Sequence, residues 1–163
     1  MKKFTLSIFC LSLFFLACQS DSATNNWKAL DLLSYGVPAV IMAPDSAKVT
    51  VDDLLGQKDI TIEGEGYSVQ LFVSDATTTN ATEVKNTMLG EVQGQEYFSK
   101  VIKEDPDGFI YETVIDSTYI SYRFYHIKIK GDKELLFQSG LRGKFSQEQA
   151  EATYQAVSQP IKK

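Results

Sequence analysis

The sequence predicts an α+β domain built on one central antiparallel β-sheet that is flanked by helices on both faces, a three-layer sandwich. Two observations lead to this fold class. Short runs of β-branched and aromatic residues alternate with turn signals along most of the chain, and segments with capped helical periodicity interrupt them. The later strands carry apolar side chains at both odd and even positions, so each face of their sheet needs cover. We expect this single domain to occupy residues 27–163.

The first part of the domain is expected to hold a short helix and then four strands. Trp27, Leu30 and Leu33 fall at helical spacing. Asn26 is a candidate N-cap, and Gly36 suits the left-handed residue that ends a helix. Apolar alternation and glycine-containing turns then predict strands at residues 39–42, 48–51, 60–63 and 67–74.

Two further helices are marked by capping signals. Asn80 and Glu83 form a capping-box pattern before an apolar stripe, and this helix is expected to cross from the first group of strands to the second. Ser146 and Gln149 form a second box, which opens a last helix that covers one face of the sheet.

The second group of strands is expected to form a meander of hairpins. Its turn signals stand at residues 105–108, 117–118 and 131–132. If each turn closes a regular hairpin, Phe109 faces His126 and Tyr111 faces Phe124, all on one face of the sheet.

A group of tyrosines beside one arginine is the candidate partner-binding surface. The same register places Tyr97, Tyr119 and Tyr125 on the opposite face, where Glu112 pairs with Arg123. Tyrosine combines a large contact area with a polar tip and is enriched at binding hot spots. The alternative, in which these tyrosines only fill cross-strand contacts, stays open. The candidate residues are therefore Tyr97, Tyr119, Arg123 and Tyr125.

Nothing in the sequence predicts a catalytic residue, a cofactor or a metal site. His126 is the only histidine, and we expect it to pack in the core between Phe109 and Phe137, because a general base or a metal site needs converging partners. The chain contains no HExxH or GxSxG motif and no complete dinucleotide fingerprint. An enzyme would need a site assembled from distant residues.

The first eighteen residues have the pattern of an export signal. Two lysines precede an apolar run at residues 4–16, which is shorter than the roughly 20 residues of a membrane span. The run ends in Phe15-Leu16-Ala17-Cys18, which resembles the bacterial lipobox. The resemblance implies cleavage after Ala17, a lipid anchor on Cys18 and a membrane as partner. Residues 19–26 are polar and are expected to form a tether.

The same signal predicts a place in the cell envelope. Gln19 follows the lipidated cysteine, and this favours the outer membrane, on its periplasmic face or at the cell surface. Removal of residues 1–17 would leave 14 basic and 21 acidic side chains, a net charge near −7. Nucleic acid is therefore not expected as a partner, since phosphate binding needs a basic face.

Two segments suggest a fold group. Residues 35–44 (YGVPAVIMAP) and 66–73 (GYSVQLFV), together with the order helix, paired strands, crossover helix, meander and final helix, resemble the Mog1/PsbP-like sandwich. Members of that group often serve as assembly factors or accessory lipoproteins, but the fold is used for unrelated tasks. No residue of known function carries over from this resemblance.

The expected function is that of a non-enzymatic accessory or binding lipoprotein of the cell envelope, with an envelope protein or a small ligand as its unknown partner. Two alternatives stay open: a hydrolase or other enzyme with a dispersed site, and a carrier of a small apolar ligand between helix and sheet. A shallow aromatic surface would favour the first function, a polar cleft the enzyme and a closed apolar cavity the carrier.

Overall fold

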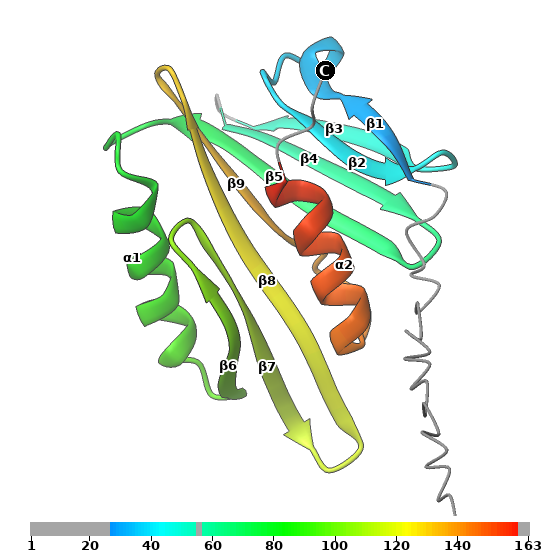
Figure 1. Ribbon diagram of the computed structural model, residues 1–163, viewed down its shortest axis with the longest axis vertical. Helices are drawn as coiled ribbons and strands as arrows, with labels where there is room; N and C mark the ends of the chain where they lie inside the picture. The colour runs from blue at the N-terminus through cyan, green and yellow to red at the C-terminus, as the bar shows by residue number, and fades with distance from the viewer. Residues whose placement is uncertain (1–26, 55–56, 160–163) are drawn as a thin grey trace, which may run out of the picture.

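The centre of the protein is a seven-stranded antiparallel sheet (Figure 1). The computed structural model describes residues 27–54 and 57–159, so the predicted signal peptide, Cys18 and tether lie outside the described residues. The sheet order is β3-β4-β5-β9-β8-β7-β6. Its strands are β3 (Lys48–Leu54), β4 (Gln57–Gly64), β5 (Tyr67–Asp75), β6 (Phe98–Asp105), β7 (Gly108–Asp116), β8 (Tyr119–Lys130) and β9 (Lys133–Ser139).

Two helices and a small hairpin complete the fold. Helix α1 (Ala81–Gln93) connects β5 to the edge strand β6, as predicted, and α2 (Gln147–Ser158) follows β9. Asn80 caps α1 by accepting from the Thr82 amide, but Glu83 accepts from the Thr78 hydroxyl instead of completing the predicted capping box. Ser146 and Gln149 form the reciprocal capping box at the start of α2. A separate two-stranded sheet pairs β1 (Trp27–Asp31) with β2 (Val40–Pro44). None of the helices in the described segments has the length and hydropathy needed to cross a membrane.

The predicted first helix is wrong. Its residues form strand β1 and then a single 3-10 turn, η1 (Leu32–Tyr35). Pairing with β2 overrides the helical spacing, and the cap is Asp31, whose carboxylate accepts a hydrogen bond from the Leu33 amide at 2.9 Å, rather than Asn26. Gly36 does end the turn in the left-handed conformation, with a φ of 77°.

The predicted turns of the meander are confirmed, but its register is not. The turn after β7 closes with Asp116 opposite Tyr119, and a bulge at Ile115 then shifts the pairing by one residue. A shift of one residue moves each side chain to the other face of the strand pair. The structure therefore pairs Phe109 with Tyr125, Tyr111 with Arg123 and Glu112 with Tyr122, instead of with His126, Phe124 and Arg123.

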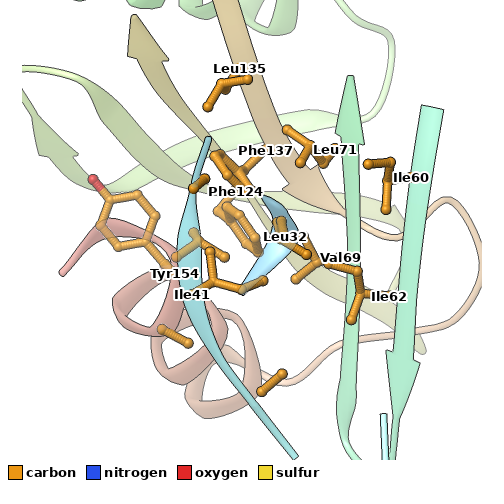
Figure 2. Close-up of a cluster of buried hydrophobic side chains, with 14 of the residues drawn as sticks. Leu32, Ile41, Ile60, Ile62, Val69, Leu71, Phe124, Leu135, Phe137 and Tyr154 are labelled. Carbon is orange, nitrogen blue, oxygen red and sulfur yellow. The ribbon is translucent and has the colours of Figure 1, made fainter. Parts of the chain in front are cut away.

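One face of the sheet, here called the packed face, holds the main core. Helix α2 and the β1–β2 hairpin lie against it (Figure 1). Figure 2 shows how side chains from the sheet, the hairpin and α2 meet there. The largest of these fully buried side chains are Leu32, Ile41, Ile60, Ile62, Leu71, Ile110, Phe124, Leu135, Phe137 and Tyr154.

Among the described segments, the opposite face, here called the open face, is covered only at one end. Val92 of α1 forms a small buried cluster there with Phe109 and Tyr111. Farther along, the row that crosses the sheet becomes polar, with Gln138 donating to Gln70 at 3.0 Å and Gln70 donating to Asp59 at 2.7 Å. The α+β class and the antiparallel sheet are thus as predicted, whereas a layer of helices over each whole face is not present in the described segments.

Candidate functional site

The open face contains a solvent-open hollow of about 310 Å³, here called the tyrosine hollow. It lies where β8 diverges from β9, next to the connection that leads from α1 into β6. β7 and β8 supply most of its walls, and the loop after β9 supplies one side. Its lining residues are Gln95, Tyr97, Tyr111, Thr113, Ile115, Tyr119, Arg123, Phe124, Tyr125, Gln138, Ser139 and Leu141.

Two tyrosines form a parallel wall of this hollow. The rings of Tyr111 and Tyr125 are stacked, with centroids 6.1 Å apart and planes inclined by 10°. Phe109 packs against both rings, at 5.7 Å from Tyr111 and 5.5 Å from Tyr125. Because Phe109 is fully buried and contacts α1 through Val92, the wall is held from behind by the small cluster of the open face.

Arg123 is the cation of the hollow and is held in place from one side. Its guanidinium donates a hydrogen bond to the carbonyl oxygen of Gly140 at 3.2 Å and lies 5.9 Å from the centre of the Phe145 ring. Phe145 is fixed in turn by backbone hydrogen bonds, accepting from Tyr122 and donating to the hydroxyl of Ser121, each at 3.0 Å. No carboxylate within the described part of the chain forms an ion pair with Arg123.

The positive charge of Arg123 influences the pKa values of the two wall tyrosines. Burial raises the pKa of Tyr111 and of Tyr125, and the positive charge of Arg123 opposes that increase in both residues. The phenols therefore stay protonated at neutral pH and can act as hydrogen-bond donors.

The rim of the hollow is apolar and exposed. Tyr97, Ile115 and Leu141 have exposed fractions of 45%, 52% and 68%, and they are half of the large hydrophobic side chains that the described residues expose. Lys144 lies over the Tyr119 ring at 5.7 Å and donates to the carbonyl oxygen of Thr118.

The four candidate residues from the sequence all line this one hollow, although the predicted pairing of Glu112 with Arg123 is wrong. Tyr97, Tyr119, Arg123 and Tyr125 were placed on the face of Glu112. The bulge moves Glu112 to the packed side of the strand pair, where it faces Tyr122 and accepts a hydrogen bond from Ser99 at 2.8 Å.

Sequence reasoning missed several other residues of the hollow. Tyr111 was assigned to the other face because of the register error, and Leu141 lies in a loop without periodicity. Gln95, Thr113 and Gln138 carry no sequence signal that separates them from ordinary surface residues.

His126 lies on the packed face and away from the hollow. It is fully buried, opposite Phe137 as predicted, with ring centroids 6.2 Å from Phe137 and 5.8 Å from Tyr154. The other predicted neighbour, Phe109, is wrong, since Gly108 stands opposite His126. Neither ring nitrogen has a hydrogen-bond partner among the described residues.

The charge state of His126 follows from this burial. Desolvation lowers its pKa from 6.5 to about 4, while the carboxylate of Asp107, 3.6 Å from Nδ1, acts in the opposite direction. The neutral imidazole thus packs as a flat core side chain.

Beyond the tyrosine hollow, the described residues form other hollows but no candidate metal site. Across residues 27–54 and 57–159 no group of three or more histidine, cysteine, aspartate or glutamate side chains is arranged to hold a metal ion. A second hollow next to the first shares Leu141 with it and is lined by Asp52, Asp59, Glu63 and Arg142, with Thr50, Thr61, Gln70 and Gly140 between them.

Comparison of the chain with protein-family models, with curated proteins and with solved structures found no match. The resemblance to the Mog1/PsbP-like sandwich stays a prediction from element order and apolar pattern.

Proposed function

We propose that this protein is a binding module of the bacterial cell envelope, anchored by lipid on Cys18, and that the tyrosine hollow is its binding site. The observation that carries the proposal is the convergence of Tyr97, Tyr119, Arg123 and Tyr125 in one solvent-open hollow on the face of the sheet that α2 does not cover. A concave site with aromatic walls and a few polar groups is the usual form of a ligand site.

The composition of the hollow supports binding rather than a reaction. Its lining, as far as the chain is described, contains no histidine and no carboxylate, and its buried phenols have raised pKa values. Proton transfer at neutral pH needs a group whose pKa lies near the working pH. An enzyme is therefore the less supported alternative, and a closed-cavity carrier is less supported because the hollow opens to solvent.

The location is proposed from the lipobox alone. Replacement of Cys18 by serine removes the thiol that accepts the lipid, so Cys18→Ser should abolish labelling with radioactive palmitate and move the protein from the membrane fraction to the soluble fraction. Intact-mass analysis of the wild-type protein with no added lipid would contradict the anchor, while leaving the hollow untouched.

Site-specific photocrosslinking of the protein in its cell envelope tests the binding function. A photoreactive phenylalanine at position 141 stands at the rim of the hollow, and one at position 33 is a matched control because Leu141 and Leu33 are 68% and 65% exposed. We expect a discrete crosslinked product from position 141, absent from position 33, that disappears when Arg123→Ala and Tyr119→Ser are added. Identical products from both positions would contradict the proposal.

A further inference from the structure

We infer that the tyrosine hollow takes a small carboxylic acid, whose carboxylate binds Arg123 and whose apolar or aromatic body lies against the wall of Tyr111 and Tyr125. This inference rests on the proposed binding function and specifies its ligand class.

Arg123 has unused hydrogen-bond donors that can bind a carboxylate. A guanidinium has five N–H donors, and in the described part of the chain only one hydrogen bond from Arg123 is made, to Gly140. Arginine binds carboxylates through two parallel hydrogen bonds, and this pair is stronger than neutral ones. The Phe145 ring and the Gly140 carbonyl already orient the group, so little conformational entropy is lost when an anion binds.

The surrounding charges favour an anion at this place. No acidic residue of the described segments lines the hollow, and Lys144 adds a second positive charge beside Tyr119. Among nearby acids, Asp116 already accepts from the amides of Thr118 and Tyr119, and Glu91 acts on Tyr125 from α1. The whole chain has a net charge of −5, so a positively charged hollow is a local exception on an acidic protein.

The neighbouring hollow gives an internal contrast. It contains Arg142, but also Asp52, Asp59 and Glu63, so its net charge repels an anion. Arg123 and Arg142 are the two arginines of the sequence, and of the two hollows only that of Arg123 has a lining without carboxylates among the described residues.

The walls define the rest of the ligand. The Tyr125 ring stays partly exposed and is backed by the stacked ring of Tyr111, which is only 4% exposed, and Ile115 and Leu141 add apolar contacts at the rim. A volume of about 310 Å³ lies at the lower end of the range for small-molecule sites. The space therefore suits a small acid with a flat or compact apolar body.

The backbone beside the hollow argues against an extended peptide strand as the occupant. Adding a strand needs free amide and carbonyl groups at a sheet edge. Where β8 has left β9, the amide of Tyr122 donates to the carbonyl of Phe145 and the amide of Phe124 donates to the hydroxyl of Ser139, each at 3.0 Å. These bonds already use the edge that faces the hollow, so a small molecule is the favoured occupant.

The test compares acids with their amides. The full protein, purified in a neutral detergent, is titrated by calorimetry with benzoate, phenylacetate, 3-phenylpropionate and indole-3-acetate, and with the corresponding primary amides. We expect at least one acid to bind at least tenfold more tightly than its amide. Arg123→Gln should reduce the affinity for that acid to the level of the amide, whereas the matched control Arg142→Gln should leave it unchanged.

The outcomes separate the ligand class from the binding function. If none of the acids binds, if each amide binds as well as its acid, or if Arg123→Gln has no effect, the carboxylate inference is wrong. The proposed function would still stand if the crosslink from position 141 remained sensitive to Arg123→Ala. If that crosslink is also indifferent to the substitution, both proposals fail.

Discussion

The packed face and the open face of the sheet are built from alternate residues of the same strands, yet they differ in burial and in the elements that cover them. Along β8, Phe124 and His126 point into the core and are 1% and 0% exposed, while Arg123 and Tyr125, which alternate with them, stay partly exposed and line the hollow. The packed face is closed by α2 and the hairpin, whereas α1 covers only one end of the open face. Stability is therefore concentrated on one face, which leaves the other available for binding.

The largest expected effect comes from removing a large side chain of the packed face. Phe124→Ala should destabilise the protein by about 3–5 kcal/mol, because Phe124 is 1% exposed and packs against Tyr154 at 5.9 Å. Chemical denaturation measures this loss. The control is Tyr119→Ser on the open face, which should cost less than about 1 kcal/mol. Equal losses in the two variants would remove the distinction between the faces.

Acid should weaken the packed face through His126. The pKa of His126 is about 4 in the folded protein against 6.5 ordinarily, so the unfolded chain binds the proton more readily. Stability should fall as the pH decreases from 6.5 to about 4, by about 3 kcal/mol in total. Denaturation curves across this range measure the loss.

Two substitutions sharpen this test. His126→Phe should fold, keep any ligand binding and flatten the pH dependence between pH 6.5 and 4, whereas His126→Asp should unfold the domain because a buried unpaired charge costs several kcal/mol. Loss of binding in a well-folded His126→Phe variant would show that His126 has a role beyond packing.

A close approach at Gly108 should give an intermediate effect. A Cβ atom there would stand 2.6 Å from the Tyr125 carbonyl oxygen and 2.7 Å from the Tyr154 hydroxyl. Gly108→Ala should therefore destabilise the protein by about 1–3 kcal/mol, since the backbone of β8 cannot yield freely. The control is Gly90→Ala in α1, where an added Cβ meets nothing within 4 Å. Gly131→Ala is not suitable, because Gly131 has a positive φ of 63°.

Gly90→Ala should be neutral or slightly stabilising, since alanine favours a helix interior. Thermal denaturation of both variants provides the comparison, and a stable Gly108→Ala protein would show that the β8 backbone at Tyr125 and the Tyr154 side chain can move without cost.

The ion pair that fixes α1 to the open face should contribute less. Lys85 is 4% exposed, and its ammonium group lies 2.6 Å from Glu104. Glu104→Gln would leave a buried cation poorly compensated and should cost about 1–2 kcal/mol, reduced by the partial exposure of Glu104. The exposed pair Lys28 and Asp45 is the control, and Asp45→Asn should cost less than about 1 kcal/mol. A double-mutant cycle measures each coupling.

The sequence predicted most strands, the turns and both capped helices because these depend on local signals. Ser146 and Gln149 cap α2 through bonds within four residues, and the hairpin turns follow from short motifs. The first helix failed because β1 is stabilised by β2, a partner whose pairing leaves no local trace at Trp27 or Leu30.

Four residues of the candidate site were predicted from the sequence, but the other lining residues and the geometry of the hollow were not. One extra residue at Ile115 decides which face Arg123 and Tyr125 occupy, and bulges have no reliable sequence signature. Tyr111 was lost from the site for this reason. Leu141 reaches the hollow only because the loop after β9 turns back along β8, which no local pattern indicates.

The most direct test uses two residues of the neighbouring strands β8 and β9 that belong to opposite faces. Unfolding free energy and the crosslink from position 141 are measured together for Arg123→Gln and for Phe137→Leu, because Phe137 is fully buried in the main core and does not line the hollow. We expect Arg123→Gln to stay within about 1 kcal/mol of the wild-type stability and to lose the crosslink. We expect Phe137→Leu to lose more stability and, while folded, to keep the crosslink. The opposite pattern, with binding lost through Phe137 and stability lost through Arg123, would contradict the division of the sheet into a packed face and a binding face.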